Sequence, residues 1–151
     1  MFSKPLKLIY LSLLVVLLAT TLPACSTPDM TAGLHMMSLD EMPMDVQSAP
    51  VTVQTAYQFA AANPEILANI PCYCGCGNVG HLSNYDCYVA SMDADGGITF
   101  DPHALGCSIC VDITQDVMRM LQEGKSAEEA RAYVDKTYSR YGPSNIPLSL
   151  P

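Results

Sequence analysis

The sequence predicts a mainly α-helical fold: a small cysteine-rich helical domain with a C-terminal αα-hairpin, a glycine-rich cysteine loop and no substantial sheet. Apolar residues recur at helical spacing over residues 106–123, and a second apolar stripe follows over residues 127–141. A gap of about one turn between two such helices is typical of an αα-hairpin. The chain has no convincing run of alternating apolar and polar residues, so we expect helices rather than strands.

The N-terminus has the layout of a secretory signal. A positively charged start precedes a twelve-residue apolar stretch at residues 8–19, which is short for a membrane-spanning helix of roughly 20 residues. Leu22 and Ala24 precede Cys25 as in the lipobox of bacterial lipoproteins, whose signal peptidase cuts after a lipid is attached to the cysteine sulfur. We therefore predict a signal peptide over residues 1–24 and an exported protein, attached to the outer face of the cell membrane through lipidated Cys25. The alternative is an uncleaved signal anchor.

The predicted mature chain, residues 25–151, is strongly acidic. Loss of the two lysines in the signal leaves five basic residues against fifteen acidic ones, a net charge of −10. No Lys or Arg occurs between Cys25 and Met118. Such a surface repels phosphate backbones, which argues against a nucleic-acid partner. It also repels anionic headgroups, so contact with the bilayer depends on the lipid, while cations are attracted.

Residues 25–50 are expected to form the lipidated cysteine and a flexible methionine-rich tether. The segment is polar and bears proline, so core packing of its methionines is not expected. Thioether sulfur favours Cu(I), which suggests a weak, exposed copper-collecting tail; a methionine-rich linker without that role is the alternative. The methionines concerned are Met30, Met36, Met37, Met42 and Met44, with His35 beside them.

The cysteine-rich domain is expected over residues 51–143, followed by a C-terminal tail at residues 144–151. Residues 55–62 predict one short helix. Residues 63–70 predict another, because Asn-Pro-Glu at its start supplies an N-cap, a proline at the first position and an acidic first turn. Residues 71–80 contain three glycines and must form a turning loop.

The later part of the domain leads into the αα-hairpin. Residues 83–92 are expected to form a helical turn or two, and residues 93–97 a plain turn that lacks the glycine of a calcium-binding loop. Gly124 is a helix stop. Ser126 and Glu129 form a capping box for the last helix.

Six cysteines and two histidines form the candidate site. Three of the cysteines alternate along the glycine-rich loop, where they can converge on one ion. Cys107 and Cys110 share a face at the start of the long helix, where the helix N-terminus favours thiolate. We predict that both groups meet in a single pocket. The candidate metal ligands are Cys72, Cys74, Cys76, His81, Cys87, His103, Cys107 and Cys110.

Three interpretations of these residues are open. An even number of cysteines in an oxidising compartment suits a disulfide-stapled interaction domain, although fifteen pairings are available. Closely spaced Cys with nearby His suits copper as Cu(I), or zinc, or an iron–sulfur cluster. Cys107 and Cys110 form a C-x-x-C pair that suits a thiol–disulfide oxidoreductase. Haem attachment is disfavoured, because Val111 follows the pair instead of histidine.

We favour soft-metal binding, with Cu(I) first. The C-x-C-x-C run with flanking glycines lets several sulfurs approach one centre, and the acidic surface attracts cations. A protein partner for metal or thiol exchange fits either the metal or the redox interpretation. No catalytic residue is predicted outside the redox alternative, and a binding protein is favoured over an enzyme.

Neighbouring aromatic and acidic residues are given structural roles. Tyr73, Tyr85 and Tyr88 are expected to pack around the loop. Asp86 and Asp112 lie next to cysteines but are interpreted as solvated acids rather than as partners that orient ligands.

The run from Pro71 to Cys76, Pro-Cys-Tyr-Cys-Gly-Cys, is highly specific. Together with the downstream histidines and the C-x-x-C pair, it resembles the PCYCGC-motif lipoprotein family over roughly residues 52–142. The resemblance implies an exported bacterial lipoprotein with one cysteine-centred domain, and it supplies no reaction.

A second, shorter resemblance lies at the C-terminal end. Cys110 followed by a helix, then Gly-Lys-Ser at residues 124–126 and the stretch 138–142, is similar to the helical hairpin of cytochrome c maturation thiol proteins. Those proteins reduce disulfides through a cysteine pair. The resemblance therefore implies the redox alternative.

Overall fold

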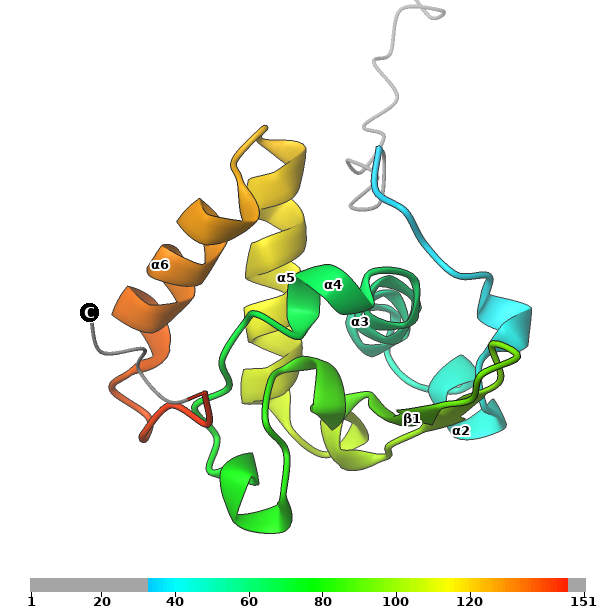
Figure 1. Ribbon diagram of the computed structural model, residues 1–151. Coiled ribbons are helices and arrows are strands. Elements are labelled where there is room, and N and C mark those ends of the chain that lie inside the picture. The colour runs from blue at the N-terminus through cyan, green and yellow to red at the C-terminus, as the bar shows by residue number, and fades with distance from the viewer. Residues whose placement is uncertain (1–32, 147–151) are drawn as a thin grey trace, which may run out of the picture.

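The computed structural model describes residues 33–146 (Figure 1). The predicted signal peptide, lipidation at Cys25, and Met30 lie outside these residues. Within the described range the chain forms five α-helices, four short 3₁₀ helices and one two-stranded hairpin, which confirms the mainly α class. None of these helices is both long enough and apolar enough to cross a membrane.

The central element is α5 (Ser108–Gln122), which packs against both α3 (Val51–Ala62) and α6 (Ala127–Tyr138) (Figure 1). The α5–α6 pair is the predicted αα-hairpin. The chain reverses at Gly124, whose φ of 79° lies in the left-handed region that glycine adopts without a steric penalty.

The predicted capping box at the start of α6 is confirmed. The backbone N–H of Glu129 donates to the Ser126 hydroxyl at 3.2 Å, and the Ser126 N–H donates to the Glu129 carboxylate at 2.9 Å. The core lies between the three helices. Ile113, Val117 and Val134 are fully buried there, and each such side chain stabilises the fold by about 1.5–3 kcal/mol.

Helix α3 is longer than predicted, because it begins at Val51, directly after Pro50. Helix α4 (Pro64–Leu67) has the predicted proline in its first turn. The predicted cap by Asn63 is wrong in its chemistry, since its side chain accepts no helix N–H. Its amide donates instead to the carbonyls of Phe59 and His35, both at 2.8 Å, and so holds the N-terminal segment against α3.

The segment before α3 packs on the domain, unlike the predicted flexible tether. It contains a 3₁₀ turn at Leu39–Glu41 and the short helix α2 (Met44–Gln47). Met42 is 3% exposed and Val46 is 1% exposed. Over residues 34–50 the chain is therefore part of the folded domain.

The methionines of this segment divide into two kinds. Met42 lies in the core, and Met36 and Met37 pack against it. Met44 is 74% exposed. The expectation that these methionines do not pack in a core is wrong for Met42, which is a member of the core cluster. A flexible thioether can fill irregular space in a core.

The hairpin of β1 (Val89–Met92) and β2 (Ile98–Phe100) was not predicted. The region was expected to be helical, which holds only for the 3₁₀ turn at Tyr85–Cys87. Of the residues of β1 only Val89 is buried. A strand with one buried side chain has no alternating pattern in the sequence, so it gave no signal.

Candidate metal centre

The cysteine loop follows α4 and turns beside the N-terminal end of α5, in the lower part of Figure 1. Gly75 and Gly80 have φ values of 88° and 96° on either side of the 3₁₀ turn Cys76–Val79. Side chains other than glycine rarely adopt this conformation. The predicted turning loop is therefore present, and it directs its cysteines back toward α5.

The sulfurs of the loop and of α5 are in contact. Cys72 Sγ lies 3.4 Å from both Cys74 Sγ and Cys110 Sγ, and Cys74 Sγ lies 3.5 Å from Cys110 Sγ. Cys87 Sγ lies 3.6 Å from Cys76 Sγ. The two groups of cysteines predicted to meet therefore do so.

These separations are too long for bonded sulfurs and are close to the spacing of two sulfurs on one metal ion. A disulfide has an S–S length of about 2.05 Å, whereas an ion with metal–sulfur bonds of about 2.3 Å and tetrahedral geometry separates its sulfurs by about 3.8 Å. The six cysteines within residues 33–146 are all free thiols. The pairings of the disulfide alternative are not formed among these residues.

Both histidines lie at the same centre. His103 Nε2 is 3.6 Å from Cys74 Sγ, and the His81 and His103 rings are 4.9 Å apart. The His81 side chain is 12% exposed, and its Nδ1 is buried without a hydrogen-bond partner. A buried nitrogen without a partner costs free energy. Binding of a metal ion to His81 Nδ1 would supply the missing partner.

All eight predicted site residues belong to groups in which every donor atom lies within 4.8 Å of the others. Such Cys/His groups could hold a metal ion. Four such groups occur among the described residues, and they share members. They are Cys74, His103, Cys107 and Cys110; Cys76, His81, Cys87 and His103; Cys72, Cys74 and Cys76; and Cys72, Cys87 and Cys110.

Crowding separates the pKa values of the thiols. Hydrogen bonding from Cys110, and then from the neighbouring thiols, holds the pKa of Cys72 far below its usual range. The same hydrogen bond raises the pKa of Cys110. Burial, followed by the charge on Cys72, raises the pKa of Cys74, and hydrogen bonding with Cys110 lowers the pKa of Cys76 to about 7. Without a cation the cluster cannot carry many negative charges, so metal binding must release protons.

The C-terminal segment holds the loop in place through Asn145. Its side-chain oxygen accepts from the Cys72 N–H at 2.7 Å, and its backbone N–H donates to the Cys72 carbonyl at 3.2 Å. Its amide nitrogen donates to the His81 carbonyl at 3.1 Å and lies 3.6 Å from Cys76 Sγ. Gly142 permits this approach, because a Cβ there would lie 2.9 Å from the Tyr73 carbonyl oxygen.

A buried polar network holds the first turn of α5. The Tyr88 hydroxyl donates to the Cys110 carbonyl at 2.8 Å and lies 2.7 Å from the Thr114 hydroxyl. Thr114 in turn donates to the Asn84 side chain at 2.7 Å. Tyr88 thus packs beside the cluster as predicted, and it also sets the position of Cys110.

Asp101 is a site residue that the sequence analysis missed. Its Oδ2 lies 3.5 Å from His81 Nε2, and its Oδ1 accepts the backbone N–H of His103 at 2.8 Å. A carboxylate on the second ring nitrogen orients a histidine that ligates metal. Its position two residues before His103 was the available signal. Asp86 accepts instead from the N–H groups of Leu82 and Ser83, and Asp112 is exposed.

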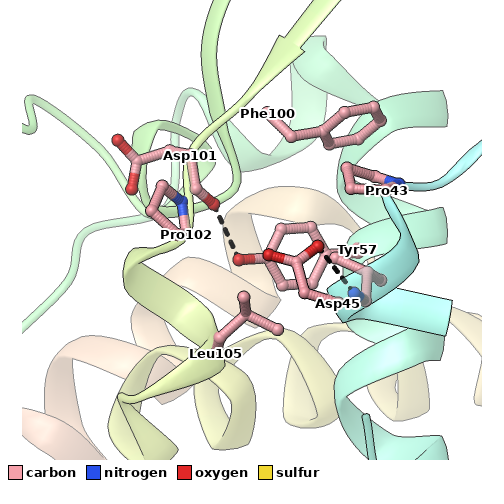
Figure 2. A pocket seen from close by; sticks show the side chains of 8 residues that line it. Pro43, Asp45, Tyr57, Phe100, Asp101, Pro102 and Leu105 are labelled. Atoms are coloured by element: carbon pink, nitrogen blue, oxygen red, sulfur yellow. Dashed lines mark hydrogen bonds between the residues drawn. The ribbon is translucent and has the colours of Figure 1, made fainter. Parts of the chain in front are cut away.

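Figure 2 shows the other side of Asp101, where a pocket of about 220 Å³ lies between the hairpin, α2 and α3. The Tyr57 hydroxyl donates to the Asp101 carbonyl at 2.7 Å, while the carboxylate points away from Tyr57. Residues from several elements line the pocket without any cysteine or histidine: Pro43, Asp45, Val46, Tyr57, Phe100, Asp101, Pro102 and Leu105. It is therefore separate from the cluster, and Asp101 connects the two.

Fold and site together define a small helical domain built around a Cys/His cluster able to hold a metal ion. Over residues 14–149 the chain matches the model of a family described as proteins of unknown function with a PCYCGC motif. The chain belongs to this family, as its residues 71–76 indicated. Searches of curated proteins and of solved structures found no match. The similarity to cytochrome c maturation thiol proteins stays a prediction.

Proposed function

We propose that the protein is an extracytoplasmic, membrane-anchored lipoprotein that binds a soft metal ion, Cu(I) in the first place, through its Cys/His cluster. The observation that carries the proposal is the convergence of six free thiols and two imidazoles within groups no wider than 4.8 Å. The N-terminal layout around Cys25 supports the lipid anchor.

The composition of the cluster favours Cu(I). Thiolate is a soft ligand that selects Cu(I), zinc or iron–sulfur clusters. The group of Cys76, His81, Cys87 and His103 also suits tetrahedral zinc. The cluster as a whole, however, has three sulfurs for each imidazole, and its all-sulfur groups around Cys72 suit the softer ion.

The burial of the donors suits binding followed by transfer. Cys72, Cys76, Cys87 and Cys110 are buried, so a bound ion is shielded from water. Cys74, Cys107 and both histidines are only partly buried. An ion could therefore enter or leave along that edge, and a protein partner that exchanges the ion would meet the domain there.

The redox alternative is less well supported. An oxidoreductase acting through Cys107 and Cys110 needs the two sulfurs to pair with each other. Cys110 is buried, and hydrogen bonding to Cys72 is the first cause that raises its pKa. Its sulfur contacts at 3.4–3.5 Å are to Cys72 and Cys74. We therefore propose a binding protein rather than an enzyme.

The test is a titration of the full chain, purified from membranes in detergent, reduced and kept free of oxygen. Cu(I) is added against a competing chelator, and zinc is added in a parallel series. We expect tight, stoichiometric Cu(I) uptake and displacement of zinc by Cu(I). Absence of Cu(I) uptake by the reduced protein would overturn the proposal.

A thiol count on the protein as isolated separates the remaining alternatives. Six cluster thiols that react only after the metal is removed support the metal centre. Six thiols blocked as disulfides would replace it with the stapled domain. Insulin reduction that is lost in Cys107→Ser would replace it with the oxidoreductase.

A further inference from the structure

We propose that the cluster holds two soft ions at once, joined by the sulfur of Cys72 as a bridging ligand. This inference rests on the proposed function and extends it from one ion to a dinuclear centre. The observation behind it is that the eight donor residues divide into two sets, each able to hold one ion.

The seven donors other than Cys72 divide into two groups, and within each group the donor atoms lie within 4.8 Å of one another. The helix group consists of Cys74, His103, Cys107 and Cys110, and the loop group consists of Cys76, His81 and Cys87. An ion held in tetrahedral geometry takes four ligands. The cluster offers eight donors, so one ion can use only half of them.

Cys72 is close to both groups. Its sulfur lies within 4.8 Å of Cys74 and Cys110 of the helix group, and of Cys76 and Cys87 of the loop group. A thiolate sulfur has several lone pairs and can bind two ions, whereas a neutral imidazole nitrogen has only one. The bridge is thus a sulfur.

His103 lies within 4.8 Å of members of both groups, and its contact with Cys74 assigns it to one. Its Nε2 lies 3.6 Å from Cys74 Sγ, within the helix group. The helix group then supplies four donors to one ion. Cys76, His81, Cys87 and the bridging Cys72 supply four to the other, which is the number that a soft ion takes at most in closed protein sites.

A single ion would leave half of the donors without a metal bond. If it occupied the helix group, buried Cys76 and Cys87 would stay as thiols, and His81 Nδ1 would stay without any partner. A buried polar atom without a partner destabilises the fold, and the second ion supplies that partner. Asn145 holds Cys72 through both its N–H and its carbonyl, which keeps the bridging sulfur in place.

The test measures stoichiometry by native mass spectrometry of the reduced full chain loaded with Cu(I). We expect two ions in the parent chain, and one in both Cys107→Ser and Cys87→Ser. In Cys72→Ser we expect a loss of at least tenfold in affinity for the second ion. Ser91→Ala is the control, because Ser91 is exposed on β1 and outside the cluster, and it should retain two.

Two readouts keep the inference separate from the proposed function. Far-UV circular dichroism of each variant shows that lost ions do not reflect lost folding. X-ray absorption at the copper edge should show a metal–metal scattering distance. One ion in the parent chain, or two ions without that distance, overturns the bridge while leaving soft-metal binding intact. No Cu(I) uptake at all overturns the proposed function itself.

Discussion

The α5–α6 hairpin and the cysteine loop are stabilised in different ways. The hairpin buries a continuous apolar stripe, including Ile113 and Val134, and its turn has a complete capping box. The loop between α4 and β1 contains only short 3₁₀ turns, and much of what it buries is sulfur, at Cys72, Cys76 and Cys87. Polar contacts, above all those of Asn145, hold its backbone. We therefore expect the α5–α6 hairpin to fold without an ion, and the geometry of the loop to depend more on its donors.

The largest effect on stability is expected from a substitution in the core of the α5–α6 hairpin. Ile113→Ala removes a fully buried side chain and should lower the free energy of unfolding by about 2–5 kcal/mol. Urea unfolding of the reduced, metal-free full chain measures it. Cu(I) stoichiometry under native conditions should be unchanged. A loss of stoichiometry in the still-folded variant would show that the two regions are not independent.

Metal binding should stabilise the cysteine loop more than the α5–α6 hairpin. At a free Cu(I) concentration of a hundred times Kd, loading should raise the free energy of unfolding by about 2.7 kcal/mol. Hydrogen exchange should show the added protection mainly in residues 71–87 and 103–110, with little change in α6. Addition of a strong chelator should reverse both effects. Equal protection throughout the chain would contradict the division into two regions.

Asp101→Asn should weaken Cu(I) binding by roughly 10–100-fold, because it removes the charge beside His81 Nε2 that orients the ring. A competition titration measures the affinity. Asp95→Asn is the control, since Asp95 is exposed in the β-turn. Loss of stability with unchanged metal affinity would assign Asp101 a purely structural role.

Asn145→Ala should weaken binding by about tenfold, because the loop loses the hydrogen bond to the Cys72 N–H and the one to the His81 carbonyl. The same titration measures it. Unfolding of the α5–α6 hairpin should change little, since Asn145 contacts only the loop side in these bonds. A stability loss equal to that of Ile113→Ala would refute this assignment.

The smallest effect is expected for Met44→Leu. Met44 is the exposed methionine of the N-terminal segment, at 74%, and its loss should leave equilibrium affinity and stability unchanged within about 0.5 kcal/mol. The variant separates two interpretations of the methionines. A slower uptake of Cu(I) in stopped-flow mixing would support a collecting role for Met44. An unchanged rate of Cu(I) uptake would indicate that the N-terminal segment has only a structural role.

Features that depend on near neighbours in the chain were predictable from the sequence. The periodicity of residues 106–123 and 127–141, the capping box at Ser126 and the turning glycines of the loop each involve residues a few positions apart. Local sterics and helix periodicity determine such features. The eight candidate ligands were also predictable from the sequence, because Cys and His side chains can bind soft metal ions wherever they lie in the chain.

Other features arose only when distant segments met. Met42 was expected in a tether and lies in the core, because burial depends on what packs against a residue rather than on its polar neighbours in the chain. The strand at Val89–Met92 exists through its partner at Ile98–Phe100. Asp101 and Asn145 carry no motif, and their roles follow from hydrogen bonds across the fold.

The sequence by itself determined a helical hairpin and a set of soft donors, since both follow from residue type and short-range spacing. The tertiary structure alone decided that Cys72 lies within 4.8 Å of four other sulfurs, that His81 has an unpaired nitrogen and that Asp101 lies beside its other ring nitrogen. Distances between residues far apart in the chain are set by packing of the whole core. The chemistry of the centre depends on those distances.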